Sequence, residues 1–244
     1  AGSRESDRTE EVRGQILLNM VLVLRDIRFA LFLLVSSGFW FIYNQVYNVL
    51  PLYAKKVVES NPAMDLYTMA NPITIVCFQL LITRLFGKMK PIRSIILGTV
   101  LIGLSMAINL VPIYASGGMR SLALNWLPLG SVFIILTVIF IAFGELFTSA
   151  RTYEWIGALS RKGQEGLFLG YVNLPIAIGA ELSGFLGPVI FDKVMCKGAT
   201  TRADGLLDLV PSSATMGWFI LVAIGFASAA SMWFYNRWLE RQTT

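Results

Sequence analysis

The chain has 244 residues, of which 55% are hydrophobic and only 14% are charged. Soluble domains carry about 25% charged residues, so this composition excludes a fully water-exposed surface and indicates a membrane protein. The net charge of +5 is spread over the ends of apolar stretches, which argues against a nucleic-acid-binding patch.

The first 28 residues come before any stretch long enough to cross a bilayer. Residues 1–14 are charged, unlike a signal peptide or a transit peptide. Residues 15–28 are apolar and partly amphipathic. Two interpretations of this lead-in stay open: a helix at the cytoplasmic interface, or the tail of a linker from a preceding domain.

Residues 29–240 contain six stretches that are apolar over 18 or more residues. About 20 residues of helix cross the roughly 30 Å of hydrocarbon in a bilayer. We therefore predict an all-α membrane protein, a six-transmembrane-helix bundle. The predicted spans are residues 29–54, 66–86, 92–114, 126–149, 166–191 and 214–236.

The basic residues predict the orientation of this bundle. If the first span starts on the cytoplasmic side, 14 of the 20 basic residues fall in inside segments and six in outside segments. Because Lys and Arg are enriched in cytoplasmic loops, we expect both ends in the cytoplasm and the protein in the plasma (inner) membrane, in contact with lipid.

The first span carries a polar and aromatic stripe. Trp40, Asn44, Tyr47 and Asn48 follow i, i+4, i+7, i+8 spacing, which predicts one shared helical face, and Gln45 lies beside it. Such a stripe either binds neighbouring helices through its amides or lines a cavity, and the sequence leaves both interpretations open.

In the second span, Asn71 precedes Pro72 near the middle. Proline bends a helix and frees a backbone carbonyl. The dipeptide therefore marks either a packing kink or a gate hinge that carries Asn71 towards a polar pathway.

The fourth span contains a carboxylate, Glu145, with Thr148 and Ser149 one turn further along. A carboxylate within a membrane helix costs about 2.5 kcal/mol or more and is by default a functional-site hypothesis. Since burial disfavours the charged form of an acid, we interpret Glu145 as a candidate proton carrier. The alternative is an ion pair with Arg151 near the cytoplasmic end.

The fifth span combines helix-softening residues with a second carboxylate. Pro175, Gly179 and Gly184 predict a bent helix that packs closely, because small residues let backbones approach. Glu181 lies near mid-depth. It either faces the pathway or pairs with a group outside this chain.

Several kinds of chemistry are not expected. Histidine is absent, whereas zinc proteases need a His pair and serine hydrolases usually need a His base. There is no G-x-x-x-x-G-K nucleotide loop. We expect no enzyme, no metal and no cofactor, and no disulfide between Cys77 and Cys196.

Four stretches in chain order resemble motifs of the proton-coupled oligopeptide transporter family of the major facilitator superfamily. The first two are Phe39-Trp40 with Gln45, similar to F-W-x-x-x-x-Q, and Asn71-Pro72, similar to N-P. The others are Glu145-Leu146 with Ser149, similar to E-x-x-x-S-P, and residues 166–170 followed by Ala177-Ile178-Gly179 with Gly184, similar to Q-G-L-M-M-G and A-I-G-N-x-x-x-G.

The resemblance implies the C-terminal six-helix half of a twelve-helix transporter that is driven by a proton gradient and carries di- or tripeptides or similar small polar solutes. The partner would be a missing N-terminal half with an E-x-x-E-R motif and a binding lysine. Glu145 and Asn71 would face the central site. Trp40, Gln45 and Ser149 would line or gate it.

The chain also departs from the family pattern. Asn44 stands where the family often has an acid, Ala180 replaces the Asn after A-I-G, and Glu181 is a carboxylate outside the pattern. Two alternatives stay open. One is a transporter of the same superfamily for another solute, such as a sugar, an amino acid, nitrate or a drug. The other is a non-transporting membrane scaffold or sensor.

Overall fold

The computed structural model describes residues 22–114 and 127–243. Within these residues, six helices are long and apolar enough to cross a membrane, which confirms the predicted six-helix bundle. They run Ile27–Val58, Met64–Phe86, Pro91–Tyr114, Leu129–Leu159, Glu165–Met195 and Pro211–Gln242. Residues 1–21 of the predicted lead-in lie outside the described residues, as do four of the basic residues on which the orientation was predicted.

Most of the six spans consist of several shorter elements. The first two spans comprise α2 (Ile27–Tyr43), the 3-10 helix η1 (Asn44–Val46), α3 (Val49–Tyr53), the π-helix η2 (Ala54–Val58), α4 (Met64–Thr68) and α5 (Ala70–Phe86). The third and fourth comprise α6 (Pro91–Ala107), the 3-10 helix η3 (Ile108–Leu110), α7 (Val111–Tyr114) and α8 (Leu129–Leu159). The last two comprise α9 (Glu165–Leu169), α10 (Leu174–Val189), the π-helix η4 (Ile190–Met195) and α11 (Pro211–Thr243).

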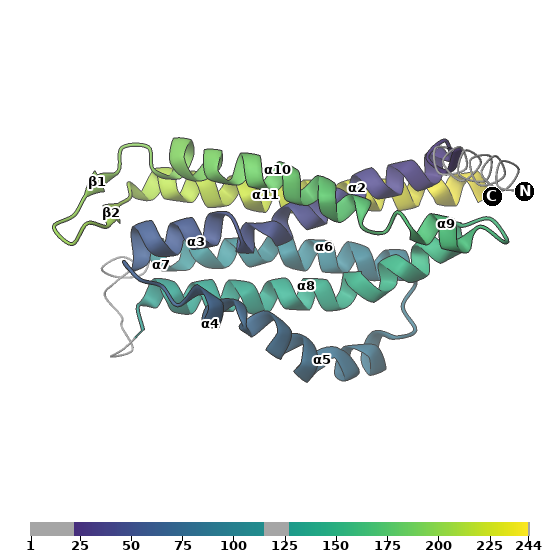
Figure 1. Cartoon of the computed structure of the whole chain (residues 1–244), viewed down its shortest axis with the longest axis horizontal. Helices are drawn as coiled ribbons and strands as arrows, with labels where there is room; N and C mark the ends of the chain where they lie inside the picture. Colours follow the sequence, from purple (N-terminus) through teal and green to yellow (C-terminus); the bar gives the residue numbers. More distant parts are fainter. Residues whose placement is uncertain (1–21, 115–126, 244) are drawn as a thin grey trace, which may run out of the picture.

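The long helices lie side by side (Figure 1), with the start of α2 and the end of α11 at the same end of the bundle. A short hairpin of β1 (Thr200–Thr201) and β2 (Leu207–Asp208) lies at the opposite end. It pairs antiparallel within the connection between the fifth and sixth spans. α8 packs along α6, α11 along α6 and α2, and α10 along α2.

Glycines let two of these helix pairs approach closely. A Cβ atom on Gly98 of α6 would lie 2.6 Å from the carbonyl oxygen of Gly144 on α8. A Cβ atom on Gly103 of α6 would lie 3.1 Å from the carbonyl carbon of Gly225 on α11. Helices in a membrane associate largely through such close packing of small residues, so α6 holds α8 and α11 at short range.

The first span is not one continuous α-helix. α2 ends at Tyr43, and η1 and a turn separate it from α3. A shared face depends on an uninterrupted 3.6-residue repeat. The prediction that Trp40, Asn44, Tyr47 and Asn48 share one helical face is wrong for Tyr47, which is exposed, whereas Trp40 and Asn48 both contact α10.

The second span is the least covered part of the bundle. Only 6% of its most apolar window is buried, against 33% to 56% for the other five spans, and Thr74 is the only buried residue of α5. The span is interrupted at Met69, between α4 and α5. Pro72 has no N–H to donate to the carbonyl four residues earlier, which accounts for a break at this point.

The fourth span is longer than predicted. α8 continues past the predicted end at residue 149 to Leu159. The charged side chains of Arg151 and Glu154 end the apolar stretch, but they do not end the helix, because both residues are good helix formers.

Candidate functional site

The carboxylate of Glu145 on α8 and the amide of Asn71 on α5 meet within the bundle. Asn71 Nδ2 donates to Glu145 Oε2 over 3.1 Å. Both side chains are half-buried. Asn71 lies in the first turn of α5, directly after the break at Met69, so the position of this break determines where its amide lies.

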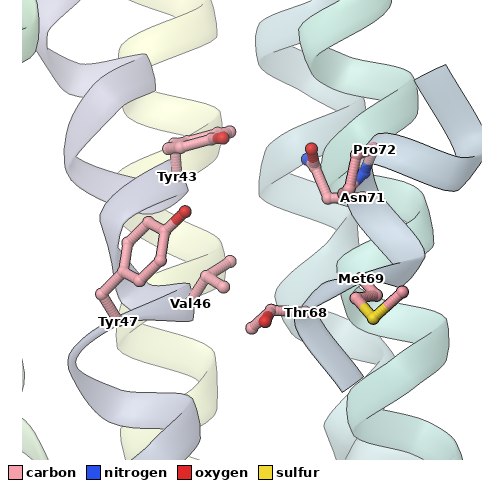
Figure 2. A pocket seen from close by; sticks show the side chains of 7 residues that line it. All are labelled: Tyr43, Val46, Tyr47, Thr68, Met69, Asn71 and Pro72. Atoms are coloured by element: carbon pink, nitrogen blue, oxygen red, sulfur yellow. The ribbon is translucent and has the colours of Figure 1, made fainter. Parts of the chain in front are cut away.

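An open pocket of about 230 Å³ lies between the first span and the second, with Asn71 in its wall. Figure 2 shows Tyr43 and Tyr47 extending from one side and Thr68 and Asn71 from the facing side. The residues that line the pocket are Tyr43, Val46, Tyr47, Thr68, Met69, Asn71 and Pro72.

Glu145 is connected to this pocket through two of its lining residues. Asn71 donates the hydrogen bond described above, and the phenol of Tyr43 interacts with both the Glu145 carboxylate and Tyr47. Both partners of the carboxylate are neutral. A carboxylate among apolar helices with neutral partners can take up a proton or bind a cationic group of a ligand.

Arg151 does not pair with Glu145, contrary to the alternative considered from the sequence. Its Nη1 atom lies 2.6 Å from Glu154 Oε2. Its Nη2 atom donates to the carbonyl oxygens of Phe86 over 3.3 Å and of Gly87 over 2.8 Å. Arg151 therefore ties α8 to the C-terminal end of α5, and no ion pair of Glu145 occurs among the described residues.

Trp40, Asn44 and Gln45 lie beside the pocket but do not line it. Gln45 is fully buried, donates to the carbonyl oxygen of Phe41 over 3.1 Å and packs against Gly187 of α10. Gln45 is therefore a buried packing residue in this structure, and its lining or gating role stays a prediction. Asn44 donates to the carbonyl oxygen of Trp40 over 2.8 Å.

The polar stripe of the first span therefore serves both purposes considered for it. Asn48 joins the first span to the fifth, with Nδ2 donating to Ser183 Oγ over 2.8 Å. Tyr47 is exposed and lines the pocket. Trp40 packs against Gly179, where an added Cβ would lie 2.6 Å from Trp40 Cβ.

The two residues that follow Glu145 by one turn diverge. Ser149 is half-buried. Thr148 is buried and fills the space over Gly98 of α6, so it does not share the side of α8 on which Asn71 approaches Glu145. Thr148 therefore takes part in the close contact of α6 with α8, and its grouping with Glu145 stays a prediction.

Glu181 is exposed and is not brought together with Glu145. Gly179 faces α2, Gly187 faces Gln45 and Asn48 further along the first span, and Ser183 bonds to Asn48. At 100° per residue, Glu181 lies on nearly the opposite side of α10. It forms no hydrogen bond or ion pair with the described residues.

The predicted packing residues of the fifth span behave differently from one another. Gly184 is exposed, and no atom of the described residues lies within 4 Å of an added Cβ. The prediction that Gly184 packs against another helix of this bundle is therefore wrong. Gly187 takes that role. Pro175 lies in the first turn of α10, where proline begins a helix without bending it.

Sequence reasoning missed Tyr43, Thr68 and Met69. Tyr43 and Tyr47 are four residues apart in an apolar span, which was a usable signal for two hydroxyls on one side. Thr68 and Met69 carry no such signal. They line the pocket because the second span is interrupted between α4 and α5.

No family model matches the sequence, and no curated protein matches it. Solved structures do match its fold. A peptide transporter POT in complex with sulfate is 18% identical, with a TM-score of 0.65 over 93% of this chain and 44% of that chain. A POT family transporter in complex with 5-aminolevulinic acid is 17% identical, with a TM-score of 0.66 over 94% of this chain and 46% of that one. The POT family transporter PepTSo is 20% identical, with a TM-score of 0.61 over 88% of this chain and 41% of that one.

At these identities the likeness concerns the fold. The chain spans less than half the length of the transporter structures that it matches. The expected six-helix membrane fold is confirmed, and it is similar to about half of each of these POT transporter structures.

Proposed function

We propose that the chain forms the C-terminal six-helix half of a proton-coupled secondary transporter for small peptides or similar small polar solutes. The observation that carries the proposal is the hydrogen bond from Asn71 to Glu145 beside an open pocket in an apolar bundle. A carboxylate within a membrane helix is by default a functional-site hypothesis, and this one has a polar partner. The order of the family-like motifs supports the C-terminal assignment.

The poor coverage of α5 supports a partner of similar size. Thr74 is the only buried residue of α5, and the pocket between the first and second spans is open. Transporters of this architecture bind their solute at the midplane between two halves that rock against each other. A second six-helix half would cover α5 and close the pocket.

In the proposed mechanism, Glu145 takes up a proton in the outward-facing form and releases it to the cytoplasm. Asn71 and Tyr43 offer neutral hydrogen-bonding groups to the carboxylate. Solute and proton each favour different conformations, and the coupling results from this difference.

The direct test is Glu145→Gln in the full-length protein, reconstituted in proteoliposomes with a pH gradient directed inward. The variant should let a labelled dipeptide equilibrate but should not accumulate it. Asn109→Ala serves as the control, because Asn109 bonds to Thr137 on a part of α8 away from the pocket. Continued gradient-driven accumulation by the Glu145→Gln protein would exclude the proposed proton role.

The solute class needs a separate test. Asn44 occupies a position where the resemblance leads one to expect an acid, so a solute other than a peptide is the second candidate. Competition of uptake by unlabelled dipeptides, sugars, amino acids and nitrate separates the two. Inhibition by dipeptides alone supports the peptide assignment, and absence of flux for every solute would support the scaffold alternative.

A further inference from the structure

The carboxylate of Glu59 joins three spans at the end of the bundle that carries the β1–β2 hairpin. Glu59 directly follows η2 and is half-buried. Its Oε1 atom accepts a hydrogen bond from the Tyr67 hydroxyl over 2.6 Å and another from Ser131 Oγ over 2.5 Å. Tyr67 belongs to α4 and Ser131 to α8, so a single oxygen connects the first, second and fourth spans.

Both donors are removed from solvent. Tyr67 is 6% exposed and Ser131 is fully buried. Charge-assisted hydrogen bonds of this length are among the stronger ones in proteins, and removal of one partner leaves a buried polar group unsatisfied. Glu59 forms no ion pair with the described residues, so the two hydroxyls are what hold its carboxylate.

This junction bears on the pocket through α4. Tyr67 is followed directly by Thr68 and Met69, which line the pocket, and then by the break after which α5 begins. α4 is only five residues long. The Tyr67 hydroxyl therefore ties this short segment, through Glu59, to Ser131 of α8, the helix that carries Glu145.

We propose that Glu59 is a positioning residue: through Tyr67 and Ser131 it holds the Thr68–Asn71 wall of the pocket at the correct distance from Glu145. The inference rests on the proposed function for its effect on transport, but not for its effect on α4. Glu59 does not line the pocket, so it acts through the position of this wall.

One experiment measures solute uptake by the full-length protein. Glu59→Ala and Tyr67→Phe should each raise the KM for dipeptide uptake roughly five- to tenfold, the size expected for loss of one ordinary hydrogen bond, with Vmax within about twofold. Glu59→Gln retains an acceptor oxygen and should restore KM. Tyr114→Phe, which removes a hydroxyl contact with Thr215, is the matched control and should change neither constant.

A second measurement follows α4 without reference to transport. Nitroxide labels on Asp65→Cys in α4 and Leu136→Cys in α8, in a background that lacks Cys77 and Cys196, report the distance between the two helices. We expect one narrow distance distribution, which broadens or shifts in Tyr67→Phe and in Glu59→Ala. If wild-type protein transports no dipeptide, the proposed function fails while this measurement still tests the junction. An unchanged distribution, or a Glu59→Gln protein as impaired as Glu59→Ala, would overturn the inference.

Discussion

Removal of the Asn71 amide should impair solute uptake only when Glu145 is present. The Asn71→Ala change deletes one 3.1 Å hydrogen bond to a carboxylate. Hydrogen bonds between membrane helices average about 0.6 kcal/mol in double-mutant cycles, whereas bonds to a charged partner reach about 1.5–3 kcal/mol. We expect a coupling energy between the two residues of at least about 1 kcal/mol, roughly fivefold in the half-saturation constant.

The assay is downhill uptake of a labelled dipeptide by proteoliposomes that contain the wild-type protein, Asn71→Ala, Glu145→Ala or the double variant. Residues that act as a unit give strongly non-additive effects, so the double variant should be no worse than Glu145→Ala alone. The same cycle with Asn109→Ala in place of Asn71→Ala should be additive. Asn109 donates to Thr137 over 2.8 Å and shares no partner with Glu145. If the free-energy effects of Asn71→Ala and Glu145→Ala add within about 0.3–0.5 kcal/mol, the two residues do not act together, and the prediction is refuted.

Three further predictions concern stability, measured as thermal unfolding of the detergent-solubilised protein. Gly225→Ala places a methyl group against the backbone of α6 and should destabilise by about 1–3 kcal/mol, whereas Gly157→Ala, with no atom within 4 Å, should stabilise slightly; equal effects would contradict the close α6–α11 contact. Asn48→Ala removes the bond from the first span to the fifth and should cost about 0.6 kcal/mol, and an unchanged melting temperature would argue against it. Burial raises the pKa of Asp26, but its hydrogen bonds and ion pair with Arg28 outweigh this effect and hold the pKa below 3.8. Asp26→Asn should therefore destabilise the protein at neutral pH by less than about 1 kcal/mol, and this cost should disappear as the pH falls below 3.8. A cost that persists at low pH would contradict the prediction.

The number of spans and a polar partner for Glu145 were predictable, because each depends on a local property of the sequence. An apolar run has to be about as long as the bilayer is thick. A carboxylate inside such a run needs a partner wherever the neighbouring helices place it. Asn71 was also identifiable, since a polar residue before a proline in an apolar span marks a point where the helix is interrupted.

The details of the helices were less predictable, because they depend on contacts between distant segments. Gly184 and Gly187 are equivalent by local sequence pattern. Gly187 packs against the buried Gln45 side chain of the first span, and Gly184 has open space around it. The break at Asn44 likewise turns Gln45 away from the pocket. Glu59 gave no signal, because its partners lie eight and 72 positions further along the chain.

The polar contacts of α5 suggest why a carboxylate is placed where it is. α5 buries only Thr74 and packs mainly on α8, so apolar burial contributes little to its position. Two polar ties to α8 mark its ends: Asn71 with Glu145 at the start, and the carbonyl oxygens of Phe86 and Gly87 with Arg151 at the finish. The Arg151 tie joins a guanidinium to carbonyl oxygens, whereas the Glu145 tie weakens when the acid is protonated. Our hypothesis is that protonation releases the pocket end of α5 while the other end stays fixed. An α5–α8 distance near Asn71 that is the same in Glu145→Gln and wild-type protein would contradict it.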